Sequence, residues 1–120
     1  MLRKLRHLFA AGLVVLLATL SSGAIAGDTL QRIVDFKVLK VGMSANQPPM
    51  TMTNREGGLM GFDVDLAKAL ATAMQVQLEI KTMPFGELMK ALEEDEIDMV
   101  LSGMSITPER TEIVSFVGPY

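Results

Sequence analysis

The chain has 120 residues, a formal net charge of −3 at pH 7 and a hydrophobic content of 49%. It contains no cysteine, and its single histidine is His7. These counts exclude disulfides, cysteine-based zinc sites and the Cys–His pairs of many nucleophilic enzymes. The acidic charge argues against nucleic acid or an anionic membrane surface as a partner, because the field of the protein attracts neither.

Residues 1–26 have the pattern of a secretory signal peptide. A basic start is followed by an apolar stretch at residues 8–20 and by a small-x-small cleavage site that ends at Ala26. The apolar stretch is shorter than the roughly 20 residues of a membrane-spanning helix, which disfavours a membrane anchor. We therefore expect an exported, periplasmic protein that begins near Gly27. Removal of Arg3, Lys4 and Arg6 changes the formal net charge from −3 to −6.

The first part of the exported chain reads as a strand, a loop and a hairpin. The strand is predicted at residues 38–42 and the loop, which holds two prolines, at residues 43–53. Glycines in a turn at residues 55–58 indicate a hairpin tip between two short strands, residues 50–52 and 59–62.

Helices and strands then alternate. The apolar spacing predicts a helix that opens at Asp63, and we expect Asp63 and Asp65 to cap it at the positive end of its dipole. A second strand follows at residues 76–80 and a second helix at residues 85–94. The nearly all-apolar residues 97 and 99–101 are typical of a central parallel strand. A fourth strand is predicted at residues 113–117.

This order indicates an α/β fold with a βαβαβ parallel sheet and right-handed crossovers. In open sheets of this kind, ligands bind beyond the carboxyl ends of the strands. Three segments follow these ends: residues 43–50, 83–87 and 102–110. The sequence therefore predicts that these segments meet around one crevice.

The segment SGMSITPER, residues 102–110, offers the groups that suit a carboxylate. Gly103 lets the backbone approach a ligand and can leave an N–H group free, while Ser105 and Thr107 supply hydroxyls. The planar guanidinium of Arg110 matches a carboxylate. The alternative is a short helical turn that Thr107 caps, with Pro108 at its first position and Arg110 in water.

The other two segments allow similar pairs of interpretations. Phe85, at the start of the second helix, packs either on the aliphatic part of a ligand or in a satellite core. Asn46 and Gln47 either hydrogen-bond a ligand or form a surface turn. Acidic residues 93–96 more simply end a helix in a solvated turn than bind a metal, because neighbouring helical residues do not face one another. No metal, cofactor or catalytic residue is expected.

Three stretches, LKVGMSANQPPM, GGLMGFDVDLAKALA and MPFGELMKALEEDEIDMVLSGMSITPERTEIVSFVGPY, together resemble the amino-terminal part of periplasmic solute-binding proteins of family 3. These proteins are the polar amino acid-binding components of ABC importers. The resemblance covers residues 37–120, and the order and spacing of its motifs make it specific. It implies the first lobe of a type II periplasmic binding protein fold, incomplete here, at residues 27–120.

The resemblance also implies roles for individual residues. Arg110 would hold the α-carboxylate of the ligand together with Ser105. A backbone group of Gly103 would meet the α-ammonium group, and Phe85 would pack on the ligand. The family commonly has an aromatic residue where Gln47 stands and an acidic residue where Ser44 stands. These differences leave a polar amino acid or a related small carboxylate as the expected ligand.

The resemblance further implies a monomeric, non-catalytic binding protein that delivers its ligand to a membrane permease. In the family a second lobe closes over the ligand, and that lobe is absent from these 120 residues. A lobe alone would then bind weakly. Two alternatives remain open: an exported dehydratase of the same fold that acts on prephenate-like acids, and a sensory or accessory domain of a larger protein.

Overall fold

The computed structural model describes residues 25–120, so nearly all of the expected signal peptide lies outside the described residues. Helix α2 (Ile25–Phe36) contains the division between the two compact units of the chain, which falls between Gln31 and Arg32. The sequence patterns above do not indicate this helix. Within the described part of the chain, no helix has the length and apolar character needed to cross a membrane.

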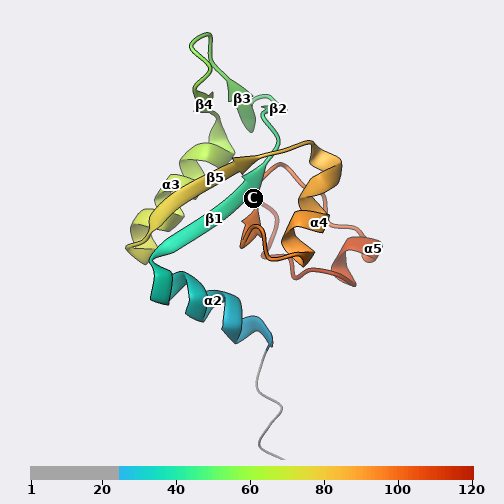
Figure 1. Ribbon diagram of the computed structural model, residues 1–120. Helices are drawn as coiled ribbons and strands as arrows, with labels where there is room; N and C mark the ends of the chain where they lie inside the picture. Colours follow the sequence, from blue (N-terminus) through green and yellow to red (C-terminus); the bar gives the residue numbers. More distant parts are fainter. Residues whose placement is uncertain (1–24) are drawn as a thin grey trace, which may run out of the picture. The chain divides into compact units, whose positions relative to one another are not determined.

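A three-stranded parallel sheet forms the framework of residues 32–120 (Figure 1). Its strands are β1 (Val38–Met43), β5 (Gln77–Thr82) and β6 (Met99–Val100), in the order β5-β1-β6. β1 pairs with β5 over six residues but with β6 only at Val41 and Gly42. The predicted βαβαβ arrangement is therefore confirmed.

The position of the third strand differs from the prediction. The central strand is β1, whereas β6 lies at one side of the sheet. The apolar residues around β6 are buried by neighbouring side chains, with Ile97 and Leu101 in two different core clusters. An apolar run thus reflects burial, which helices can provide as well as flanking strands.

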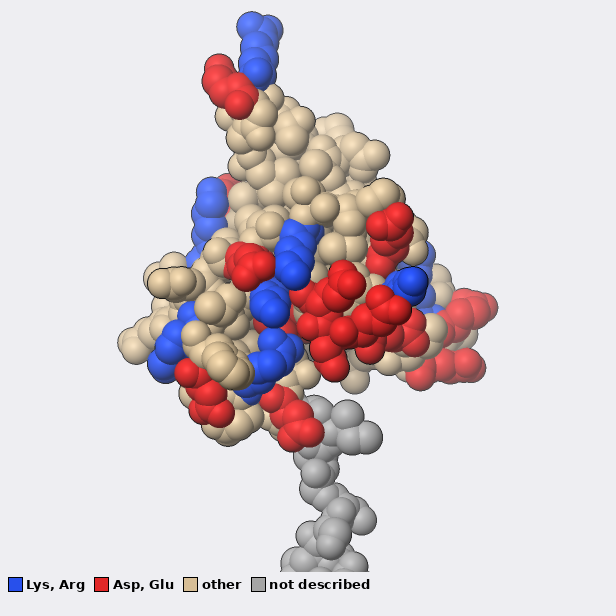
Figure 2. All heavy atoms as spheres, viewed as in Figure 1, with Lys and Arg blue, Asp and Glu red and all other residues tan. Residues whose placement is uncertain are grey.

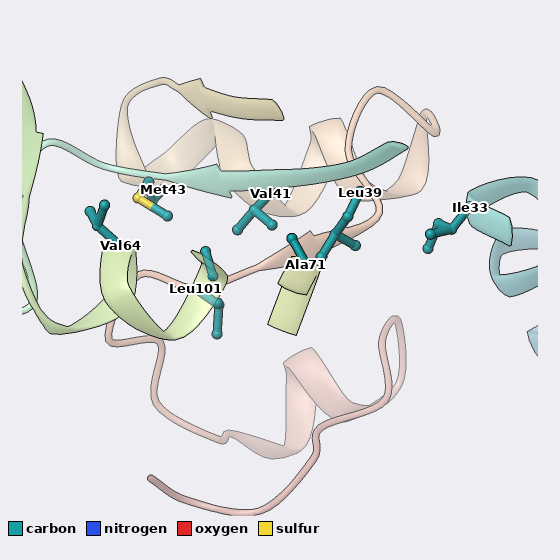
Figure 3. Close-up of a cluster of buried hydrophobic side chains, with 8 residues drawn as sticks. Ile33, Leu39, Val41, Met43, Val64, Ala71 and Leu101 are labelled. Atoms are coloured by element: carbon teal, nitrogen blue, oxygen red, sulfur yellow. The ribbon is translucent and has the colours of Figure 1, made fainter. Parts of the chain in front are cut away.

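Helices cover both faces of β1. α3 (Phe62–Met74) packs Val64, Ala67 and Ala71 against Leu39, Val41 and Met43, in the cluster shown in Figure 3. On the opposite face, α4 (Leu88–Glu93) lies close to Gly42, where a Cβ atom would be 3.1 Å from Leu88 Cδ2. The predicted helix at residues 85–94 begins as a 3₁₀ turn, η1 (Phe85–Glu87), before α4.

A smaller antiparallel sheet carries the predicted hairpin. It consists of β2 (Asn46–Gln47), β3 (Thr51–Thr53) and β4 (Leu59–Met60), with Met52 opposite Met60. The turn between β3 and β4 is held by Asn54, whose Oδ1 accepts the N–H group of Gly58 at 2.6 Å.

The predicted fourth strand at residues 113–117 is wrong. The backbone N–H groups of Ile113 and Val114 donate to the carbonyl of Arg110, which extends α5 (Pro108–Thr111) by a turn. Residues 115–120 have no regular secondary structure. Alternating apolar residues form a strand only beside a partner strand, and Val117 is instead 93% exposed.

Candidate functional site

The three segments beyond the carboxyl ends of the strands do meet, as predicted. The Met83 N–H group donates to the carbonyl of Met43 at 3.2 Å, which joins the segments after β5 and β1. The Ser44 N–H group donates to Ser102 Oγ at 2.9 Å, which joins the segments after β1 and β6. The carboxyl ends of parallel strands lie at one edge of a sheet, and these contacts bring their loops together there.

Arg110, Ser105 and Phe85 form the first group of predicted site residues. Arg110 Nη1 donates to the Ser105 carbonyl at 2.8 Å and to Ser105 Oγ at 3.0 Å. The Arg110 guanidinium lies over the Phe85 ring, 5.6 Å from its centroid, within the range of a cation–π interaction. The other guanidinium N–H groups of Arg110 make no hydrogen bond to any described residue, so donors remain for an anion.

The local structure that carries Arg110 is the capped turn considered as the alternative. Thr107 is the N-cap of α5, and its Oγ1 accepts the Arg110 N–H group at 3.3 Å. Pro108 occupies the first turn of this helix, as predicted. The cap and a carboxylate site are compatible, because the cap uses the backbone of Arg110 and leaves its side chain beside Ser105.

Gly103 differs from the sequence interpretation in one respect. Its φ of +54° is the left-handed conformation that favours glycine. Its N–H group is not free, because it donates to Asp63 Oδ2 at 3.1 Å. Asp63 and Asp65 lie in the first turn of α3, at the positive end of its dipole, as predicted, but the N-cap of this helix is Gly61. Asp63 is fully buried. The hydrogen bond between its side chain and Gly103 connects α3 to the loop after β6.

Ser44 and Gln47 form a second group together with Ser102. Gln47 Oε1 accepts the Ser44 hydroxyl at 2.8 Å and the Ser102 hydroxyl at 2.7 Å. Ser44 is buried, and its carbonyl accepts the Thr51 hydroxyl. Sequence reasoning missed Ser102, although a hydroxyl directly after a buried strand was a signal that could have identified it.

A hollow of about 400 Å³ lies beside the second group, at the carboxyl ends of β1 and β5. Its lining residues are Ser44, Ala45, Asn46, Thr82, Met83 and Pro84. Asn46 is therefore placed at a surface concavity, while Arg110 and Ser105 do not line it.

Two ionisable groups near these loops have shifted pKa values. A backbone hydrogen bond at Glu109, followed by a hydrogen bond with Thr107, lowers the pKa of Glu109. Burial, followed by the charge of Asp63, raises the pKa of Tyr120. The Tyr120 ring also stacks on Phe62, with 6.0 Å between the ring centroids.

The residues of the acidic run at 93–96 are exposed, which confirms the predicted solvated turn. Figure 2 shows acidic side chains gathered over α4 and the turn that follows it. Within residues 25–120, no group of three or more His, Cys, Asp or Glu side chains is arranged to hold a metal ion.

Comparison with known proteins identifies the family. Residues 39–120 match the family described as bacterial extracellular solute-binding proteins, family 3. The chain belongs to this family. It is 38% identical over 108 residues to ABC transporter arginine-binding protein 1 of Escherichia coli, an alignment that covers 90% of this chain and 41% of the relative. It is 34% identical over 120 residues to cyclohexadienyl dehydratase of Pseudomonas aeruginosa, covering 98% of this chain and 44% of the relative.

Solved structures of family 3 proteins show the same fold. The arginine-bound form of domain 1 from TmArgBP matches with a TM-score of 0.73 and 43% sequence identity, over 74% of this chain and 71% of that domain. The predicted type II binding-protein lobe is thereby confirmed. The chain spans less than half the length of the full-length relatives named above.

Proposed function

We propose that this chain is the first lobe of a monomeric periplasmic solute-binding protein that captures a polar amino acid for the permease of an ABC importer. The observation that carries the proposal is the Arg110 guanidinium, which Ser105 and Phe85 hold while its other N–H groups stay unbonded among the described residues. Export after cleavage near Ala26 is part of the same proposal. The names of the relatives make L-arginine the first ligand to test.

The carboxylate of the ligand would bind at Arg110 and Ser105. A carboxylate accepts two parallel N–H bonds from a guanidinium, and the Ser105 hydroxyl lies 3.0 Å from Arg110 Nη1, close enough to share the same anion. Because Ser105 and Phe85 already restrict the Arg110 side chain, less conformational entropy is lost when the ligand binds.

The α-ammonium group would bind at the carbonyl of Gly103. The N–H group of Gly103 is occupied by Asp63, so the carbonyl is the backbone group of this residue that suits a cation. Phe85 is half-buried and would pack on the aliphatic part of the ligand.

Ser44 and Gln47 would act as a unit on the ligand side chain. The Ser44 hydroxyl is committed to Gln47, so Ser44 would orient the Gln47 amide instead of contacting the ligand. With Gln47 Oε1 turned toward the two serines, the amide N–H groups are the part left for a ligand. These N–H groups suit the side-chain acceptor of L-glutamine or L-histidine and offer no partner to the guanidinium of L-arginine, so the three ligands are compared below.

Calorimetric titration of the exported protein with L-arginine, L-histidine and L-glutamine tests the proposal. Arg110→Ala should weaken binding by about 30-fold or more, because the ligand carboxylate loses a charge-assisted pair worth roughly 2–5 kcal/mol. Arg55→Ala is the matched control, since Arg55 is exposed in the turn between β3 and β4. Equal affinities of the Arg110 and Arg55 variants would contradict the carboxylate role.

A second candidate is an exported dehydratase, which the dehydratase relative supports by matching 98% of this chain. The substrate would be a prephenate-like acid whose carboxylate binds Arg110 in the same way. Incubation with such an acid, followed by absorbance of the aromatic product, distinguishes the two functions. Turnover would favour the dehydratase, whereas saturable binding of an amino acid without turnover would favour the binding protein.

A further inference from the structure

Asp63 is a buried acid whose role the proposed binding contacts do not include. It lies in the first turn of α3 and is fully buried. Its Oδ2 accepts the Gly103 N–H group, and its Oδ1 has no hydrogen-bond partner in the described part of the chain. Aspartate is almost never fully buried unless it is paired, so this placement calls for a function.

The contact with Gly103 restrains the loop that carries the proposed carboxylate site. Gly103 separates β6 from Ser105, and its left-handed φ of +54° turns the chain at this point. A Cβ atom on Gly103 would meet only Met50 Cγ, at 3.8 Å, so the space on this side of Gly103 is open. The hydrogen bond to Asp63 therefore fixes the peptide plane before Gly103 and, with it, the direction of the chain toward Ser105.

The start of α3 also contacts Tyr120. The Tyr120 ring stacks on Phe62, the residue before Asp63, with 20° between the ring planes. Burial, and after it the negative charge of Asp63, raises the pKa of the Tyr120 phenol. The carboxylate that supports the Gly103 loop thus also acts through its charge on the phenol that stacks beside it on Phe62.

We propose that Asp63 is a positioning residue that holds the Gly103 loop in its ligand-binding form and links this loop to the segment at residues 115–120 through Tyr120. The proposal rests on the proposed function for its ligand, but the link between Asp63 and Tyr120 does not need a ligand. Because Tyr120 stacks on Phe62, the residue next to Asp63, a change in the Gly103 loop that moves the Asp63 carboxylate also changes the surroundings of Tyr120.

The test compares Asp63→Asn with Asp65→Asn in the exported protein. Both changes remove one negative charge from the first turn of α3, but the Asp65 side chain is 79% exposed and contacts Lys68 instead of Gly103. Asp63→Asn should weaken L-arginine binding by about tenfold, because a charge-assisted hydrogen bond to the loop becomes a neutral one. Asp65→Asn should bind as the parent protein does.

A spectroscopic titration gives a readout that a purely structural role would not move. The chain has one tyrosine and no tryptophan, so its near-ultraviolet titration reports Tyr120 alone. Without ligand, Asp63→Asn should lower the pKa of Tyr120 toward its ordinary value, and Asp65→Asn should not. An unchanged Tyr120 titration in Asp63→Asn would overturn the link, and unchanged arginine affinity would overturn the positioning role.

The parent protein supplies a measurement that does not depend on the folding of a variant. Saturating L-arginine should shift the Tyr120 titration, because the loop that binds the ligand shares its support with Tyr120. Bound arginine without any shift would overturn the proposal. A parent protein that binds no amino acid would instead reject the proposed function, and the ligand-free titration of Asp63→Asn would still decide the link to Tyr120.

Discussion

Arg110 has two neighbours that hold its side chain. Ser105 accepts two hydrogen bonds from a single guanidinium nitrogen, and Phe85 lies beneath the guanidinium plane. The rest of the guanidinium is then presented in one orientation. A lysine at this position would keep the charge but lose the planar array of donors, so charge alone does not describe what this residue contributes.

The raised pKa of Tyr120 makes the stability of the folded chain depend on pH in the alkaline range. Above the ordinary tyrosine pKa of 10.0, the unfolded chain loses the phenol proton before the folded chain does. The unfolded state then binds fewer protons, so the free energy of unfolding decreases as pH rises. The contribution of Tyr120 to the free energy of unfolding is fully present below pH 10.0. It is lost as the pH rises through the higher pKa that Tyr120 has in the folded state.

We expect urea unfolding of the parent protein to lose more stability across this window than unfolding of Tyr120→Phe. The variant keeps an aromatic ring next to Phe62 and changes no other ionisable group, so the difference between the two proteins isolates the phenol. If the free energy of unfolding changed with pH in the same way for both proteins, Tyr120 would have the same pKa in the folded and unfolded states.

At the scale of elements, Gly61 allows α3 to start against the loop before β3. Its φ is +132°, and a Cβ atom there would lie 2.3 Å from the Met50 carbonyl oxygen. This close approach lets the Asp63 N–H group donate to that same carbonyl at 3.0 Å. The start of α3, and with it the position of Asp63, depends on the absence of a side chain at residue 61.

Gly61→Ala should therefore lower the free energy of unfolding by about 3 kcal/mol, because it combines backbone strain with a clash against backbone atoms. Gly86→Ala in η1 is the control, since a Cβ atom there meets nothing within 4 Å and its φ is not positive. Chemical denaturation of both variants measures the effect. Similar denaturation midpoints for the Gly61→Ala and Gly86→Ala variants would mean that the loop before β3 moves away from residue 61 at little cost in free energy.

Periodicity and turn chemistry predict most elements of this lobe. Apolar spacing located α3, and the glycines at residues 57–58 located the hairpin. The same patterns misplaced β6 in the sheet and added a strand at residues 113–117, because neither pattern records which partner a strand has. Helix α2 was not predicted, because it begins at Ile25, within the segment expected to be removed, and its apolar spacing was not assigned to the folded chain.

The candidate site was predictable where local chemistry, or the meeting of loops at the carboxyl ends of parallel strands, suffices. The proximity of Arg110 and Ser105 follows from five-residue spacing in one loop. The contact between Asp63 and Gly103 joins residues that are 40 positions apart, and the hydrogen bond from Ser102 to Gln47 joins residues 55 apart. Such contacts depend on how α3 and β2 are placed against β6, which no local pattern determines.

At the scale of the whole molecule, export predicts that residues 1–26 are removed. Protein recovered from a periplasmic extract should begin at Gly27, because the small residues Ala24 and Ala26 fit a signal peptidase site. Intact mass and amino-terminal sequencing measure this directly. Retention of Met1 in a membrane fraction would contradict cleavage and favour an anchor.

The uneven pairing of β1 has a consequence for folding order. β1 and β5 share a six-residue ladder, while β6 adds only two pairs, at Val41 and Gly42. Pairing of β6 with β1 closes a longer stretch of chain than pairing of β5 with β1 and forms fewer ladder pairs, so we expect β6 to dock last and to open first. The loop that bears Ser105 and Arg110 follows β6 directly. Amide hydrogens there exchange with solvent through local opening, and a ligand that binds this loop slows exchange in β6 before it slows exchange in β5.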